Sequence, residues 1–253
     1  LVQRLLAADP ALCAAAGWEV LEAAPPLDAD PADPTVRIER GLAREAQTRE
    51  HAPELFAIHP MHALEAEEEI VFLADAFLSH VPESGAHVPG YATWLDTQDL
   101  TPAYDHLHLV LQLLQWQKRL RGEPATRWVL KTPAHLGYLD TLRARFPGLH
   151  LVHLHRDPQE TIPSGASLNT VLHRMHSDDV DPERVGRDWL ERMGWTHDRA
   201  LDARNRWVED PSAPRVTDIA FREVVADPWP QVARVYADLG AALTDEAESS
   251  MRA

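Results

Sequence analysis

The chain has 253 residues, which is enough for one large α/β domain or for one domain with a helical insertion. Its formal net charge of −16 argues against a nucleic-acid partner and an anionic-membrane partner, and a single cysteine, Cys13, excludes an intrachain disulfide. One cysteine is typical of a reducing compartment, so a cytoplasmic location is expected. No apolar run approaches the ~20 residues that cross a bilayer, so no membrane span is predicted.

The amino-terminal residues predict a helix that ends early. Apolar residues recur at helical spacing between Leu1 and Leu6, and Asp9-Pro10 stops the pattern. The chain has no initiator Met and begins inside this pattern, which indicates a fragment of a longer protein. Trp18-Glu19-Val20 follows, and then a predicted loop rich in Asp and Pro that reaches Pro34.

Residues 35–122 are predicted to form a mainly helical insertion. The apolar spacing of residues 64–78 is typical of an amphipathic helix, whose polar face carries Glu65, Glu67, Glu68 and Glu69. Residues 80–90 are rich in Pro, Gly and His and are expected to be a loop. Thr101-Pro102 predicts the next helix, because a capping residue precedes a proline at the first helical position.

Residues 127–240 are predicted to contain the sheet core. Trp128 to Leu130 and Leu149 to His155 have the composition of buried strands, and a helical segment separates them. The first strand ends at Lys131 and the second at Arg156. Ligands of parallel sheets bind outside the carboxyl ends of the strands, where helix N-termini also point. Two basic strand ends in one βαβ unit therefore predict a phosphate- or sulfate-bearing ligand.

The rest of the chain predicts further helices and one strand. A long amphipathic helix is expected at about 183–207, a strand around 216–221, and a last helix at 229–239 that Gly240 ends. The polar residues from there to Ala253 are expected to fray. We therefore predict a single α/β domain over residues 1–253.

Arg156 and Ser164 are the first candidate ligand-binding residues. Arg156 follows a strand, Pro158 suits the first turn of a helix, and Ser164 lies about two turns into that helix. A guanidinium can grip a phosphate with two nitrogens, and the hydroxyl can add a donor. The alternative is a surface arginine paired with Asp157 and a serine bonded to its own helix backbone.

Three further residues are candidates for group-transfer chemistry. Lys131 is placed to contact a bridging or leaving oxygen, and His135 to accept a proton from an attacking hydroxyl. Alternatively, His135 caps or packs under the following helix. Glu19 is a candidate base if burial raises its pKa, although most acidic residues of such a chain are simply solvated.

His153 and His155 alternate along a predicted strand and therefore point to the same face. Such a pair can bind a metal ion, but no third ligand stands at a telling distance in the sequence. Two hydrogen-bonded core histidines are the preferred interpretation, and no metal site is predicted.

Several segments together resemble the bacterial branch of the sulfotransferase family. They are LKTPAHL, FPGLHLVHLHRDPQETIPSGAS and HSDDVDPERVGRDWL, with similar stretches from residue 1 to about residue 240. The RDP turn with a serine eight residues after its arginine is the specific part. The resemblance implies a P-loop-like α/β fold with a central parallel sheet flanked by helices.

It also implies a reaction. The donor would be 3′-phosphoadenosine 5′-phosphosulfate (PAPS), and the acceptor a hydroxyl or amine of a small molecule or carbohydrate, with no metal required. Arg156 and Ser164 would bind the donor's 3′-phosphate, Lys131 would lie near the transferring group, and Glu19 or His135 would be the base. The family's loop of the type PRTGTT, which holds the 5′-phosphosulfate, is absent, and the chain begins just after its place.

Two other functions remain open at this point. One is a non-catalytic nucleotide-binding protein that kept the fold and lost the active loop. The other is a P-loop kinase of a small molecule, which would need a Mg²⁺-holding hydroxyl in that loop. The residues themselves do not fix the oligomeric state.

Overall fold

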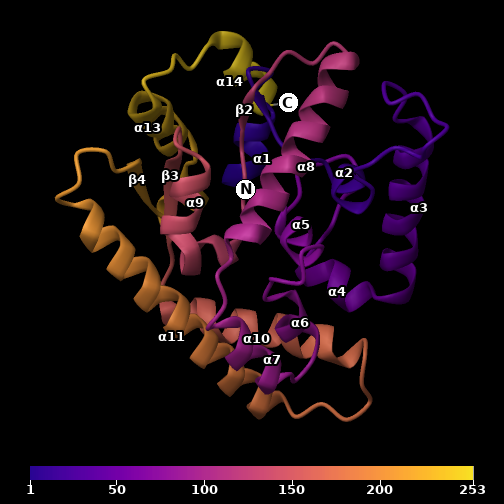
Figure 1. The fold of residues 1–253 in the computed structure, drawn as a ribbon, viewed down its shortest axis with the longest axis vertical. Helices are drawn as coiled ribbons and strands as arrows, with labels where there is room; N and C mark the ends of the chain where they lie inside the picture. Colours follow the sequence, from indigo (N-terminus) through magenta and orange to yellow (C-terminus); the bar gives the residue numbers. More distant parts are fainter. Residues whose placement is uncertain (253) are drawn as a thin grey trace.

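The structure, a computed structural model, describes residues 1–252 and contains two pairs of parallel strands. β1 (Leu12–Cys13) pairs with β2 (Arg127–Trp128), and β3 (His150–His155) pairs with β4 (Arg215–Ala220). Both pairs join segments that are far apart in sequence, with helices in between (Figure 1). This is the arrangement of an α/β protein and confirms the predicted class.

The helices are, in chain order, α1 (Val2–Ala7), α2 (Gly17–Leu21), α3 (Thr35–His51), α4 (Pro53–Ile58), α5 (Ile70–Ala74), α6 (Val81–Gly85), α7 (Pro89–Leu95), α8 (Thr101–Leu120), the 3₁₀ helix η1 (Pro133–Tyr138), α9 (Leu139–Arg145), α10 (Pro158–Arg174), α11 (Pro182–Trp207), α12 (Phe221–Ala226), α13 (Trp229–Leu239) and α14 (Asp245–Arg252). Within residues 1–252, no helix combines the length and apolar character that crossing a membrane requires.

One face of the strands packs against α1, α13 and α14. Leu6 of α1, Ile219 of β4, Val235 of α13 and Met251 of α14 belong to one buried cluster, against which Val152 of β3 also packs. Burial of such side chains stabilises a fold by roughly 1.5–3 kcal/mol each. The two ends of the chain are therefore held against the sheet.

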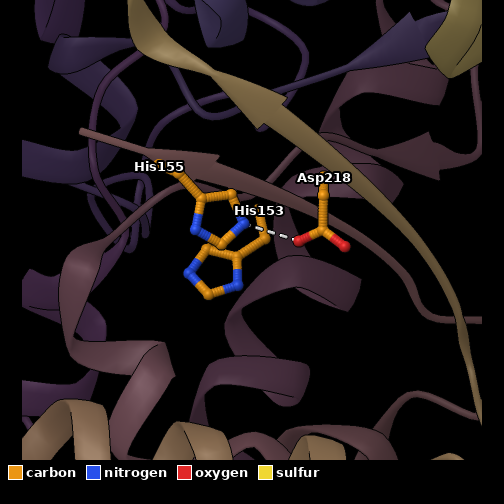
Figure 2. Close-up of side chains that lie close together, drawn as sticks. All are labelled: His153, His155 and Asp218. Carbon is orange, nitrogen blue, oxygen red and sulfur yellow. Dashed lines mark hydrogen bonds and ion pairs between the residues drawn. The ribbon is translucent and has the colours of Figure 1, made fainter. Parts of the chain in front are cut away.

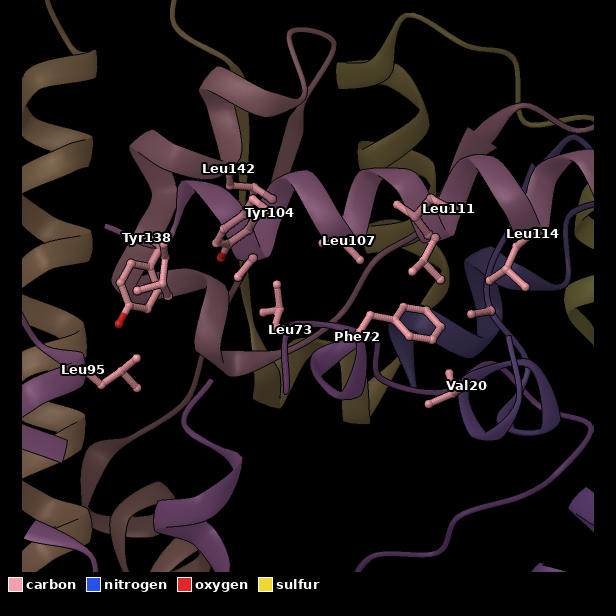
Figure 3. Packing of buried hydrophobic residues seen from close by; sticks show 14 residues of the cluster. Val20, Phe72, Leu73, Leu95, Tyr104, Leu107, Leu111, Leu114, Tyr138 and Leu142 are labelled. Carbon is pink, nitrogen blue, oxygen red and sulfur yellow. The ribbon is translucent and has the colours of Figure 1, made fainter. Parts of the chain in front are cut away.

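The other face packs against α8, α9 and α11. The largest cluster follows α8, whose inward side chains meet residues of α5 and α9 (Figure 3). Leu107, Leu111 and Leu114 are nearly fully buried there, against Phe72. A smaller cluster joins α11 to β3 and β4. The strands thus lie between two layers of helices.

The acidic segment before α5 differs from the prediction. A single amphipathic helix is expected over residues 64–78, but α5 covers only Ile70–Ala74. Ala66 makes an antiparallel bridge to Ala16 after β1, and Glu67 donates its N–H to the Ala15 carbonyl at 2.9 Å. Long-range backbone pairing has therefore replaced the local helix.

Three smaller predictions were also wrong. Residues 80–90 are largely helical, in α6 and the start of α7, because Pro82 and Pro89 sit where a helix tolerates proline. The carboxyl-terminal tail forms α14, since Ala247 and Met251 bury their side chains. Phe221 begins α12 instead of ending a strand.

The predicted starts of α10 and α11 and the predicted end of α13 are confirmed, but the predicted cap of α8 is wrong. Thr101 is the first helical residue and follows Leu100, and its hydroxyl donates to Asp99 at 2.7 Å instead of accepting a backbone N–H. Pro158 stands in the first turn of α10, and Asp181 caps α11 by accepting N–H bonds from Glu183 and Arg184. Gly240 ends α13 with φ 68°, a left-handed conformation that favours glycine.

Candidate functional site

Arg156 lies in the turn between β3 and α10 and stays accessible. Its Nε bonds the Glu160 carboxylate at 3.1 Å, and its guanidinium stacks over Phe221 at 4.9 Å. Among residues 1–252 its two Nη nitrogens have no hydrogen-bond partner. Two such nitrogens are able to bind a phosphate as a fork, and the N-terminus of α10 begins two residues later.

Ser164 lies on α10 and is exposed. Glu160 and Ser164 are four residues apart on that helix, so their side chains lie on the same face. Arg156 contacts this face through its bond to Glu160. Next to Ser164, a Cβ added to Gly165 would overlap the indole nitrogen of Trp189 on α11. Close packing of α10 on α11 therefore fixes the position of this face.

Lys131 follows β2 and is held at two points by consecutive acidic residues. Its ammonium group forms an ion pair with the Glu68 carboxylate, and its backbone N–H donates to Oε2 of Glu69 at 2.9 Å. The Lys131 side chain is 49% exposed, whereas that of Glu68 is 15% exposed. The ammonium group therefore reaches solvent and is open to an anionic ligand.

The same acidic segment also contacts α1. Gln3 donates to the Glu67 carbonyl at 2.9 Å, and Arg4 pairs with Glu65 at 2.7 Å. The segment thus ties Lys131 to the first helix of the chain. The local pattern of these glutamates predicts a solvated helix face, and no signal in the sequence identifies their partners.

His135 belongs to a buried hydrogen-bonded chain. Its Nε2 lies 2.7 Å from Oε1 of Glu69, and its Nδ1 lies 2.9 Å from the Tyr104 hydroxyl. Glu69 is 1%, Tyr104 0% and His135 8% exposed. Because Glu69 also accepts the Lys131 N–H, one carboxylate links His135 to Lys131.

Glu19 is fully buried in α2, where it holds two cations. Its carboxylate pairs with Lys118 at 2.8 Å and with Arg121 at 2.9 Å, and it accepts the Ala16 N–H at 3.0 Å. Lys118 and Arg121 stand at the end of α8. A cavity of ≈ 440 Å³ is lined by Ala16, Lys118 and Glu123, so this network borders open space.

His153 and His155 have a third neighbour that the sequence does not reveal. Their ligand atoms and one oxygen of Asp218 on β4 lie within 4.8 Å of one another (Figure 2). Both oxygens of Asp218, however, bond Arg204 at 2.7 Å, and Arg204 also lies 3.0 Å from Nδ1 of His153.

This arrangement favours a hydrogen-bonded network over a metal centre. The imidazole rings of His153 and His155 are tilted, with centroids 4.2 Å apart, and the guanidinium of Arg204 already neutralises Asp218. The prediction of two core histidines is wrong for His155, whose side chain is 49% exposed because it lies at the end of the strand. Burial lowers the pKa of His153 to about 4, with help from His155 and Arg204. The hydrogen bonds from Arg204 lower the pKa of Asp218 well below its usual value.

The candidate residues therefore fall into three groups. Arg156 and Ser164 share one face of the β3–α10 unit, Lys131 and His135 share Glu69, and Glu19 stands in its own network at the end of α8. The first two groups place accessible cations beyond two strand ends, and the second and third contain the buried carboxylates of Glu69 and Glu19.

The sequence, compared with known families, matches the sulfotransferase family model over residues 1–245. The chain belongs to the sulfotransferase family. Its similarity to solved structures agrees with the P-loop-like α/β fold of that family. Sulfotransferase STF1 of Mycobacterium tuberculosis superposes with a TM-score of 0.84 at 31% identity, over 99% of this chain and 66% of that one. STF9 of Mycobacterium avium has a TM-score of 0.83 at 24% identity, over 99% and 63%.

Curated relatives of this sulfotransferase-family chain include the omega-hydroxy-beta-dihydromenaquinone-9 sulfotransferases Stf3 of Mycobacterium bovis and Mycobacterium tuberculosis. Each is 26% identical over 159 residues, which are 60% of this chain and 38% of the relative. The chain thus aligns with well under half the length of these relatives.

Proposed function

We propose that the protein transfers a sulfuryl group from PAPS to a hydroxyl or amine. The acceptor oxygen or nitrogen attacks sulfur, and the bond from sulfur to the 5′-phosphate oxygen breaks in line. The products are the sulfated acceptor and 3′,5′-diphosphoadenosine, and the acceptor's proton passes to a base. Charge gathers on the leaving phosphate, so a protein assists mainly by alignment and by neutralising that charge.

The observation that carries the proposal is the accessible guanidinium of Arg156 beside the start of α10. In the family's motif this arginine and the serine eight residues later bind the donor's 3′-phosphate. Arg156, in the turn before α10, and Ser164, on α10, stand at these positions, and neither is buried. The N-terminus of a helix adds backbone N–H groups that favour an anion.

Lys131 is the proposed contact for the transferring group or the leaving oxygen. Its ammonium is accessible, its main chain is fixed by Glu69, and it lies just beyond the strand that pairs with β1. An anionic ligand at this position replaces Glu68 as the partner of the ammonium.

The resemblance offers two candidates for the base, Glu19 and His135. The Glu19 carboxylate is fully buried, and its partner Lys118 lines a cavity that would give an acceptor space beside that network. His135 lies closer in sequence to Lys131, but both of its ring nitrogens make short contacts.

The acceptor is proposed to be a small molecule or a carbohydrate. The curated relatives are named for a menaquinone derivative, which is a small molecule with a hydroxyl group. A cytoplasmic location fits a donor of this kind and the single free, buried cysteine.

A binding measurement on the full-length protein tests the donor assignment. Titration with 3′,5′-diphosphoadenosine should give saturable binding, and Arg156→Ala should weaken it by about 30- to 100-fold, or about 2–3 kcal/mol, the range for a hydrogen-bonded charged group. Arg187→Ala on α11 is the matched control, since Arg187 is an exposed arginine with its own i,i+4 glutamate. Equal affinity of Arg156→Ala and the parent would remove the assignment. Binding of ATP in preference to 3′,5′-diphosphoadenosine would favour a kinase.

A further inference from the structure

Tyr104, His135 and Glu69 connect three separate elements through side chains alone. Tyr104 comes from α8, His135 from η1, and Glu69 from the residue before α5. The contacts are 2.9 Å from the Tyr104 hydroxyl to Nδ1 and 2.7 Å from Nε2 to Oε1, and Oε2 accepts the Lys131 N–H at 2.9 Å. All three side chains are more than nine-tenths buried.

The hydrogen positions in these contacts follow from their burial. The Tyr104 hydroxyl has one hydrogen-bond partner among residues 1–252, which is His135. Burial raises the pKa of Tyr104 well above its usual value, so the hydroxyl keeps its hydrogen. A buried O–H without an acceptor costs about 1–3 kcal/mol, so this hydrogen must point to Nδ1.

The remaining roles are then determined. Nδ1 is the acceptor, so the neutral ring carries its hydrogen on Nε2 and donates it to Oε1 of Glu69. A ring with hydrogens on both nitrogens would leave the Tyr104 hydroxyl without an acceptor. Oε2 of Glu69 accepts the Lys131 N–H, and every group in the network is satisfied.

We infer that Tyr104, His135 and Glu69 are positioning residues that fix the main chain at Lys131, and that His135 is not the base. A general base needs a free lone pair that faces the acceptor, and both ring nitrogens of His135 are in use. A buried carboxylate needs donors, and His135 supplies one to Glu69 while the Lys131 N–H supplies the other. This inference rests on the proposed role of Lys131.

Two substitutions of His135 separate positioning from proton transfer. The amide of glutamine offers one donor and one acceptor, as the ring does, but takes no proton near neutral pH. We expect His135→Gln to keep kcat within about fivefold of the parent, with the same shape of its pH dependence. His135→Ala should raise the donor KM by about tenfold or more, which is about 1.4 kcal/mol. His87→Gln, an exposed histidine that pairs with Asp188, is the matched control and should match the parent.

Equal and large losses of kcat in His135→Gln and His135→Ala, with donor binding intact, would overturn the inference. Thermal unfolding of each variant shows whether the comparison is between folded proteins. Glu69→Gln provides a further comparison, since an amide has one acceptor oxygen for the two donors, and it should raise the donor KM more than it lowers kcat.

The tautomer of the His135 ring in the unmodified protein provides a test that needs no variant. In ¹⁵N spectra of histidine at about pH 7.5, where an ordinary imidazole is neutral, we expect Nε2 of His135 to carry the hydrogen, before and after 3′,5′-diphosphoadenosine binds. A hydrogen on Nδ1, or a change of tautomer on binding, contradicts the inference. If the nucleotide does not bind at all, the proposed function fails instead, and the tautomer result still stands.

Discussion

At the scale of single residues, every cation proposed to hold the donor already has an acidic neighbour. Arg156 bonds Glu160, and Lys131 pairs with Glu68. Arg156 and Glu160 are 38% and 62% exposed, and exposed pairs of this kind contribute about 0.2–1 kcal/mol, so a doubly charged phosphate displaces the carboxylate readily. These pairs explain how an acidic protein presents cations to an anionic ligand.

Glu19 differs, because its cations are buried with it. The side chains of Lys118 and Arg121 are 9% and 11% exposed; both pair with the buried Glu19 carboxylate, and both also pair with the exposed Glu123. Glu19→Gln removes that charge and should lower the free energy of unfolding by about 3 kcal/mol, as expected for breaking a buried pair. Urea denaturation followed by circular dichroism measures this loss.

Glu22→Gln is the control for this prediction, because Glu22 pairs with the exposed Arg40 and should change stability by less than about 0.5 kcal/mol. A stable Glu19→Gln protein with no turnover would favour Glu19 as the base. If Glu19→Gln is stable and active, neither the structural nor the catalytic role holds.

At the scale of elements, the contact of α10 with α11 positions the proposed phosphate site. Gly165 lies against the indole of Trp189, where an added Cβ would overlap three ring atoms. Only the absence of a side chain permits this approach. Because Ser164 precedes Gly165, any shift of α10 moves the hydroxyl and the Arg156 turn together.

Gly165→Ala should therefore lower the unfolding free energy by about 1–3 kcal/mol, the usual cost of overpacking. It should also weaken binding of 3′,5′-diphosphoadenosine, measured by calorimetry. Gly194→Ala on α11 is the matched control. A Cβ added at Gly194 meets no atom of residues 1–252 within 4 Å, and loss of a helical glycine should stabilise by about 0.5–1 kcal/mol. If Gly165→Ala changes neither the free energy of unfolding nor the nucleotide affinity, the two helices can separate without consequence.

At the scale of the whole molecule, the network on β3 and β4 makes stability depend on pH. The folded pKa of His153 is about 4, mainly because of burial, and the unfolded value is about 6.5. The unfolded chain therefore binds a proton before the folded one as pH falls. Stability from this group is complete above about pH 6.5 and falls as pH drops towards about 4. The folded pKa of Asp218 is depressed, so Asp218 reduces stability further only when the pH falls below the pKa of an unfolded aspartate, about 3.9.

The free energy of unfolding should consequently decrease by up to about 1 kcal/mol per pH unit between about pH 6 and 4.5. In His153→Gln this slope should be shallower. The measurement is urea denaturation at several pH values, with His51→Gln, an exposed histidine on α3, as control. An unchanged slope in His153→Gln would assign the acid sensitivity to other groups.

Local sequence was sufficient to predict α8, α10, α11, α13 and β3 and many of their ends. Pro158, Asp181 and Gly240 act through backbone geometry within a few residues, so their helix boundaries were predictable. The basic residues at the ends of β2 and β3 were predictable for the same reason, since each follows its strand closely.

The pairing of charges, in contrast, depends on the packing of distant segments. Glu69 and Asp218 are separated from their histidine partners by 66 and 63 residues, and Glu19 from Arg121 by 102. Acidic side chains near α5 have the same local pattern whether they face water or a buried imidazole. Long-range pairing, as between Ala66 and Ala16, outweighs helix propensities of at most about 1 kcal/mol per residue. The local sequence pattern therefore determined the fold class, whereas contacts between distant segments determined the arrangement of the site.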